Sequence, residues 1–151
     1  MAENSRFPKT YKTELLGICK RDAEATAFKR NIKWLNRRVK LVLNVEEPDG
    51  KQVEKAAKIA EALYEKAEYW NRRCNKFLLS KVLLLKNEYW LEDDEEPVAP
   101  DEFLRRLDLL RIAISPSGGF LFLFYDEEMF GSHFVEVSGN RKQGFTEFDI
   151  S

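Results

Sequence analysis

The chain has 151 residues, of which 44% are hydrophobic and 34% charged, and its formal net charge is −1. This length and composition are typical of one folded domain. The lack of a basic excess argues against nucleic-acid binding, and no stretch approaches the roughly 20 apolar residues that a membrane helix needs. The start of the chain lacks the basic and apolar segments of a signal peptide. Cys19 and Cys74 are the two cysteines, and we expect reduced thiols in a cytoplasmic protein.

The N-terminal third predicts a β-hairpin. Residues 1–14 are polar and are predicted to be a flexible lead-in to a single domain over residues 15–151. Residues 28–34 and 39–45 alternate apolar and polar side chains, which is typical of half-buried strands. Asn36, between them, suits the positive φ of a tight turn.

The longest predicted element is a helix from Val53 to about Tyr89. Its apolar residues recur in steps of three and four, so one side of the helix stays apolar. Asp49 is its predicted N-cap, and Gln52 would complete a capping box. Unbroken, the helix would span roughly 55 Å. Since this exceeds the width of such a domain, we expect a bend or break near residues 71–75 or around Ser80. The Leu-rich second half is expected to be the more buried.

The remaining sequence predicts a loop, a short helix and further strands. An acidic run at residues 92–96 is expected to form the loop, and Pro100 is expected to open the short helix. Residues 120–125 are apolar on both faces, as in a central strand. The fold class is therefore predicted to be α+β. We expect an antiparallel sheet of five to seven strands, one long helix, bent or broken, packed across one face, and a short second helix.

Six stretches of the sequence share the pattern of a known family, and they are residues 16–17, 32–34, 87–90, 103–107, 119–124 and 130–137. In these stretches the chain resembles an uncharacterised bacterial family, a domain of unknown function. In the family pattern the long helix ends in Asn-Glu-x-Trp, and a C-terminal strand has the form aromatic-Gly-His-x-Ile-x-Val. This chain departs from that pattern by placing Ser132 between Gly131 and His133. The resemblance covers about residues 15–151. It implies mainly a fold, and it also implies an association with toxin-immunity loci.

His133 is the single histidine, so any histidine-dependent chemistry depends on it. As a general base it would need an orienting carboxylate, and Asp126, Glu127 and Glu128 are the nearby candidates. The alternative is a strand histidine that bonds a backbone carbonyl or packs beside a tryptophan. No nucleophile or phosphate loop accompanies it in the sequence, which favours the alternative. We expect no metal and no other cofactor, since carboxylates alone would have to supply the remaining ligands.

The acidic run is the second candidate site. It consists of Glu92, Asp93, Asp94, Glu95 and Glu96. A functional patch of this kind would mimic nucleic acid or steer a basic toxin active site toward the protein. The alternative is a solvated loop that keeps the protein soluble, which is the commoner role of a short charge run.

These observations favour a non-enzymatic protein-binding domain. Its most concrete form is an immunity-type inhibitor that occludes a cognate bacterial toxin or effector. The contacts would be the acidic run and any sheet face that the helix leaves uncovered. That face would carry either Leu121, Leu123 and Tyr125 or Phe120, Phe122 and Phe124. The alternatives are a small enzyme or ligand-binding domain that uses His133 with nearby carboxylates, and a structural or regulatory subunit. The sequence leaves the oligomeric state open.

Overall fold

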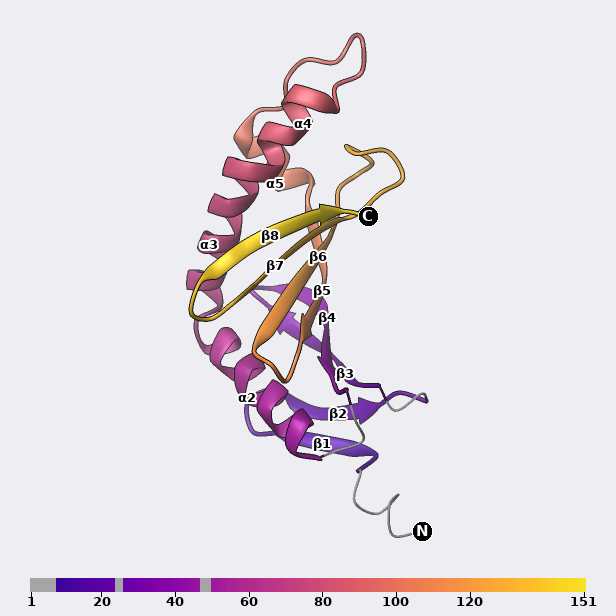
Figure 1. Ribbon diagram of the computed structural model, residues 1–151, viewed down its shortest axis with the longest axis vertical. Coiled ribbons are helices and arrows are strands. Elements are labelled where there is room, and N and C mark those ends of the chain that lie inside the picture. The colour runs from indigo at the N-terminus through magenta and orange to yellow at the C-terminus, as the bar shows by residue number, and fades with distance from the viewer. Residues whose placement is uncertain (1–7, 24–25, 47–49) are drawn as a thin grey trace.

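The computed structural model describes residues 8–23, 26–46 and 50–151. These residues form one eight-stranded sheet with helical segments packed on one of its faces (Figure 1). The strands are β1 (Thr10–Thr13), β2 (Gly17–Arg21), β3 (Ala27–Trp34), β4 (Arg37–Asn44), β5 (Asp108–Ile114), β6 (Gly119–Tyr125), β7 (Val135–Asn140) and β8 (Gly144–Ile150). The helical segments are α2 (Gly50–Glu65), α3 (Ala67–Phe77), a π-helical turn at Leu78–Val82, α4 (Leu83–Tyr89) and α5 (Pro100–Arg106).

The strands lie in the sheet in the order in which they occur along the chain. Among the described strands, neighbours are antiparallel except β4 and β5, which are parallel. The prediction of an antiparallel sheet of five to seven strands is therefore wrong, because the described sheet is mixed and has eight strands. The parallel pair arises because the helical segments between β4 and β5 form a crossover, which returns the chain to the sheet in its original direction.

The extra strand is β1, at one edge of the sheet. It pairs antiparallel with β2 and lies within the segment predicted to be a lead-in, so that prediction is wrong for residues 10–13. Its sequence, Thr-Tyr-Lys-Thr, has no apolar alternation to reveal it. Residues 1–7 of the predicted lead-in and Asp49, the predicted N-cap, lie outside the described residues. Gln52, the other half of the predicted capping box, accepts a hydrogen bond from the backbone N–H of Glu46 at 2.7 Å.

The predicted hairpin is confirmed as β3 and β4. Trp34 pairs with Arg37, so Leu35 and Asn36 form a two-residue turn. Both turn residues have positive φ, 48° for Leu35 and 69° for Asn36. This backbone geometry follows the right-handed twist of the strands. Asparagine tolerates it well, whereas leucine adopts it because both common two-residue hairpin turns need a positive φ at their first residue.

The predicted long helix is interrupted at two places. One is Lys66, whose φ of −119° and ψ of 41° separate α2 from α3. This break was not predicted, since the helical pattern of the sequence continues through it. The other is the π-helical turn, which includes Ser80 and therefore lies at one of the two predicted positions. The other predicted position, residues 71–75, lies inside the regular helix α3.

The π-helical turn keeps one side of the helix facing the core. Buried residues recur every four positions, at Trp70, Cys74, Leu78, Val82 and Lys86. In a regular α-helix each four-residue step drifts by about 40° around the axis, since one residue turns it by about 100°. The wider π turn reverses part of this drift. Position 86 consequently still faces inward, although the residue there is a lysine.

The Leu-rich second half of the helix is not the more buried half, contrary to expectation. Leu84 is exposed, and Leu79 and Leu85 are only half-buried. The segment α2 is predicted by its alanines to be the less buried part, yet it contributes five buried residues: Val53, Ala56, Ala57, Ala60 and Leu63. Small side chains let α2 approach β4 and β5 closely, so apolar bulk alone does not indicate burial.

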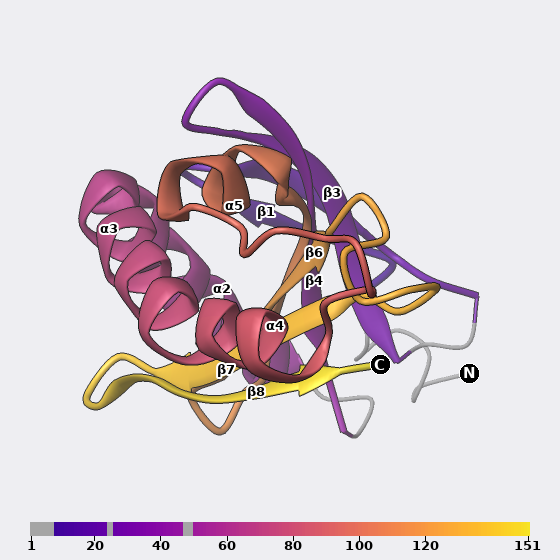
Figure 2. The same cartoon turned by 90° about the horizontal axis from the view of Figure 1, so that it is seen from above.

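The main core lies between the helices and one face of the sheet, which curves round them (Figure 2). In β6 the phenylalanines Phe120, Phe122 and Phe124 are buried against the helices. The other face of the same strand carries Leu121, Leu123 and Tyr125, which are half-buried or exposed. The structure thus shows which of the two expected faces is left uncovered.

Candidate functional site

A hollow of about 1020 Å³ lies at the end of the molecule where α4 stops, at the top of Figure 1. Its acidic lining residues are Glu92, Asp93, Asp94, Glu95 and Glu128. Two cations, Lys86 and Arg106, and two aromatic residues, Tyr89 and Trp90, also line it. One wall is the loop that follows α4, and the other is the turn that follows β6. The hollow therefore brings together acidic residues more than 30 positions apart in the sequence.

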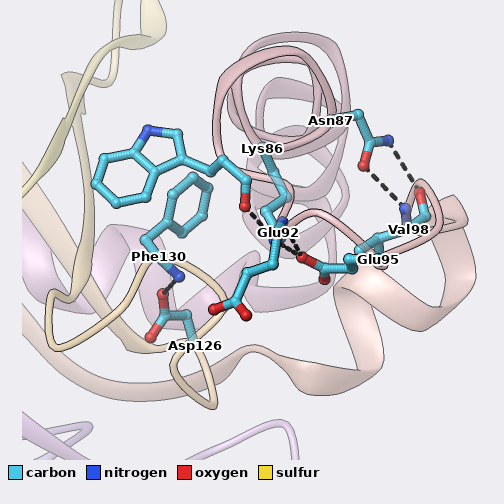
Figure 3. A network of polar contacts seen from close by, with 8 residues as sticks. Lys86, Asn87, Glu92, Glu95, Val98, Asp126 and Phe130 are labelled. Atoms are coloured by element: carbon cyan, nitrogen blue, oxygen red, sulfur yellow. Dashed lines mark hydrogen bonds and ion pairs between the residues drawn. The ribbon is translucent and has the colours of Figure 1, made fainter.

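The loop after α4 is fixed by a buried lysine (Figure 3). Lys86 is 1% exposed, and its Nζ donates hydrogen bonds to Glu95 Oε1 at 2.8 Å and to the carbonyl of Trp90 at 2.6 Å. A buried ammonium destabilises a fold unless it is paired and hydrogen-bonded, so these two acceptors hold the loop over the lysine. Glu95 Oε1 also accepts the backbone N–H of Glu92 at 3.1 Å.

These contacts stabilise the ionised form of Glu95. The hydrogen bond from Lys86, and then the one from the backbone N–H of Glu92, hold the pKa of Glu95 below its ordinary value. Glu95 is therefore a structural carboxylate. Of the acidic run, it is the member whose charge is already neutralised within the molecule.

A second contact closes the far end of the same loop. The side-chain amide of Asn87 donates to the carbonyl of Val98 at 3.1 Å and accepts the backbone N–H of Val98 at 2.8 Å (Figure 3). Val98 is itself buried in the core. Because Lys86 and Asn87 are adjacent on α4, one turn of helix anchors both ends of the acidic loop.

The opposite wall is organised by Asp126, which is fully buried. Its carboxylate accepts the backbone N–H groups of Glu128 at 3.2 Å and Phe130 at 3.0 Å. These bonds hold the backbone of Glu127 and Glu128 at positive φ values of 51° and 62°, which are uncommon for residues other than glycine. Burial raises the pKa of Asp126, and the hydrogen bond from Phe130 opposes that rise.

Two contacts join other elements to this wall. Arg106, at the end of α5, donates from Nε to Glu127 Oε1 at 3.3 Å. Trp90 packs edge-on against Phe130, with their ring centroids 5.5 Å apart. The first contact neutralises Glu127, and the second joins the end of α4 to the turn after β6. Both walls of the hollow are consequently tied to each other.

The structure gives the residues predicted from sequence different roles. Five of them line the hollow: Glu92, Asp93, Asp94, Glu95 and Glu128. Asp126 lies buried beneath it, and Glu127 pairs with Arg106. Glu96 is exposed outside the lining. The predicted acidic loop and the predicted carboxylates after β6 are therefore parts of one surface.

His133 is exposed and lies edge-on against Trp90, with their ring centroids 5.9 Å apart. It thus packs beside a tryptophan, as the alternative to a catalytic role predicted, but it precedes β7 (Val135–Asn140), so the prediction of a strand histidine is wrong. In the part of the chain that the structure describes, no hydrogen bond or ion pair joins His133 to a carboxylate. Within the same residues no three histidine, cysteine or acidic side chains are grouped closely enough to hold a metal ion.

Sequence reasoning missed Lys86, Asn87 and Arg106. A lysine in a Leu-rich helix is expected to point to solvent. The signal that would have found it is the four-residue spacing of buried positions that ends at Lys86. Asn87 and Arg106 carry no such signal, because their partners are fixed by tertiary structure.

No helix in residues 8–23, 26–46 and 50–151 is long and apolar enough to cross a membrane. No curated protein matches the chain, and neither does any solved structure. A family model described as an uncharacterised protein conserved in bacteria (DUF2262) matches residues 13–150. This match includes both walls of the hollow, and it confirms the resemblance to an uncharacterised bacterial family without bearing on toxins. The chain belongs to this family of uncharacterised bacterial proteins, DUF2262.

Proposed function

We propose that this protein is a non-enzymatic binding domain whose acidic hollow holds a basic segment of a partner protein. The observation that carries the proposal is the imbalance of charge within the hollow. Both of its cations are engaged with carboxylates, Lys86 with Glu95 and Arg106 with Glu127. The exposed acids of the lining form no ion pair within the described residues, and these are Glu92, Asp93, Asp94 and Glu128.

The concave shape strengthens the effect of this charge. Carboxylates on facing walls produce a more negative potential than the same groups on a flat surface, because the low-dielectric walls focus the field. A basic segment is therefore attracted from solution and oriented on approach. Tyr89 is 75% exposed and Trp90 37% exposed, and their ring faces suit a lysine or arginine side chain. Acidic and aromatic residues at one site thus favour a cationic ligand.

The fixed walls lower the cost of binding. Lys86 and Asn87 hold one wall, and Asp126 holds the other. Since the acidic loop is already ordered before a partner arrives, little conformational entropy has to be lost on association. The hollow is therefore suited to a tight and specific complex as well as to electrostatic attraction.

The specific form of this function that we propose is inhibition of a bacterial toxin or effector by occlusion. A basic surface that binds nucleic acid is complementary to the acidic hollow, so an inhibitor would cover it and exclude the substrate. Charge complementarity supports this form, together with the analogy to small α+β immunity proteins.

The test compares the wild-type protein with two triple variants. The hollow variant carries D93N, D94N and E128Q, and the matched control carries E14Q, E65Q and E68Q at exposed positions elsewhere. The partner captured from a bacterium that encodes the protein is purified, and its association rate is measured over a range of salt concentrations. We expect at least a tenfold lower rate for the hollow variant at low salt, about 1.4 kcal/mol, and an unchanged rate for the control. Equal rates for all three proteins would exclude the hollow as the binding site.

Inhibition of the partner is tested in a separate activity assay. The catalytic activity of the captured partner is measured with increasing amounts of the wild-type protein and of each variant. We expect stoichiometric inhibition by the wild-type and control proteins and weaker inhibition by the hollow variant. A partner that binds through the hollow but keeps its full activity would rule out inhibition while leaving the binding function intact.

A further inference from the structure

The uncovered face of the sheet carries a row of charged residues, with two cations on one side of a central leucine and two anions on the other. Five residues lie side by side on successive strands from β4 to β8: Lys40, Arg111, Leu123, Glu136 and Asp149. Paired residues of neighbouring strands share a face, so all five belong to the face opposite the buried phenylalanines of β6. Lys40, Arg111 and Asp149 are exposed, and Leu123 and Glu136 are half-buried. The row has two cations, a central leucine and two anions.

The charges in this row face like charges on the neighbouring strand, and they form no ion pairs within the described part of the molecule. Lys40 is directly opposite Arg111, and Glu136 is directly opposite Asp149, and like charges at such positions destabilise a sheet. Glu136 accepts a hydrogen bond from Ser151 Oγ at 3.0 Å. In the described residues Lys40, Arg111 and Asp149 form no ion pair. A binding partner with the opposite order of charges would relieve both repulsions.

We propose that this face binds a second copy of the chain, in a symmetric pair whose twofold axis runs parallel to β6. Rotation about that axis exchanges the two sides of β6. Arg111 of one copy then lies over Glu136 of the other, Lys40 lies over Asp149, and Leu123 meets its own counterpart. An axis perpendicular to the strands would place each cation over the same cation, so the charges select the first arrangement.

Apolar side chains surround the row and provide surface to bury. Ala113 and Leu121 form the neighbouring row of β5 and β6. Tyr125 is 40% exposed and packs against Phe134, which is 39% exposed, with a ring-centroid distance of 6.1 Å. Burial of this apolar surface would supply affinity, and the charges would fix the orientation. Stacked sheets lie about 10 Å apart and within about 30° of each other, which keeps the central strands in register.

A nucleic acid is the main competing occupant, since further cations lie on the same face of β3 and β4. It would account for Lys40 and Arg111, but it would leave Glu136 and Asp149 close to phosphate groups. A second copy accounts for both halves of the row. This inference is independent of the proposed function, because the hollow contributes no residue to the row.

The test uses two charge-reversal variants that are expected to complement each other. K40E/R111E makes the row entirely negative, and E136K/D149K makes it entirely positive. In sedimentation velocity the wild-type protein is expected to shift from monomer to dimer with increasing concentration. Each variant alone is expected to dimerise at least about tenfold more weakly, and their equimolar mixture is expected to recover the dimer. Recovery in the mixture also shows that both variants are folded.

A matched control reverses two cations of the same face outside the row, K20E/K33E. It is expected to dimerise like the wild-type protein. A wild-type protein that stays monomeric at all concentrations, or variants that dimerise alone as well as the wild type does, would overturn the proposal. So would a mixture that stays monomeric, or nucleic acid that copurifies with the wild-type protein and is lost from K40E/R111E.

Discussion

Lys86 and Glu95 form an ion pair, 2.8 Å from Nζ to Oε1, in which the lysine is the more deeply buried partner. The lysine side chain is 2% exposed and that of the glutamate 29% exposed. The pair is therefore asymmetric. Loss of the glutamate leaves a buried ammonium with one acceptor, the carbonyl of Trp90, whereas loss of the lysine leaves a carboxylate that reaches solvent.

This asymmetry predicts that removing Glu95 lowers the free energy of unfolding more than removing Lys86 does. We expect E95A to lower the free energy of unfolding by about 2–3 kcal/mol, because it leaves the ammonium of Lys86 buried without its counter-ion. K86M is expected to cost less, since it removes the buried charge itself and methionine fills a similar volume. Urea denaturation at neutral pH measures both values.

The control is Glu96, the exposed neighbour of Glu95 in the acidic run. E96A is expected to change stability by less than about 0.5 kcal/mol, as is usual for surface substitutions. If E95A were no more destabilising than E96A, the ion pair would not anchor the loop. If K86M were the most destabilising of the three, the explanation from the buried ammonium would be wrong.

Glu95 and Asp126 predict opposite effects of acid on stability. The pKa of Glu95 is lowered in the fold, so its contribution is complete above the unfolded pKa of about 4.3 and is lost as pH falls through the folded value. The pKa of Asp126 is raised by burial, so protonation in the fold precedes protonation of the unfolded chain, and the protein gains stability from this group as pH falls toward about 3.9.

Two variants separate these contributions in urea denaturation between pH 6 and pH 3. We expect E95Q to lose less stability than the wild-type protein on acidification, because the carboxylate that must be protonated is gone. D126N is expected to lose more than the wild type, because the compensating gain is gone. Parallel pH profiles for all three proteins would show that neither carboxylate is linked to folding in this way.

The fold was predictable where local chemistry determines it. The β3–β4 hairpin follows from alternation and from Asn36, and the interruption near Ser80 follows from the length limit on a single helix. The break at Lys66 and the strand β1 have no local signature, because each depends on what the segment packs against. The parallel pairing of β4 and β5 is likewise set by the path of the helices across the sheet.

The candidate site was predictable only as separate parts. Charge runs revealed the acidic loop and the carboxylates after β6, but the sequence does not show that they face each other across one hollow. It also treats all acids of the run alike, although Glu95 is paired with Lys86 and Asp93 forms no ion pair with any residue that the structure describes. Burial of Lys86 decides this difference, and burial of a lysine contradicts the general preference of that residue for solvent.

Asn87 predicts a measurable effect on the acidic loop. In N87D the carboxylate can still accept the backbone N–H of Val98, but it cannot donate to the carbonyl of Val98, which it repels instead. We expect a loss of about 1–2 kcal/mol in stability and faster hydrogen exchange at the amide of Val98. The half-exposed Asn71 supplies the control, since N71D on the neighbouring helix should leave that exchange rate unchanged. Unchanged exchange in N87D would show that the loop is held without this contact.

Gly139 in β7 and Gly119 in the neighbouring strand β6 are expected to tolerate an alanine very differently. A Cβ at Gly139 would lie 1.9 Å from the carbonyl oxygen of Gly144, a backbone atom in β8 that cannot move without breaking the β7–β8 pairing. A Cβ at Gly119 in β6 would lie 3.8 Å from the carbonyl oxygen of Gly139, an ordinary contact. We therefore expect G139A to lower stability by about 3 kcal/mol or more and G119A by less than about 1 kcal/mol. Thermal unfolding monitored by circular dichroism distinguishes them, and equal melting temperatures would mean that β8 tolerates a shift at this close approach.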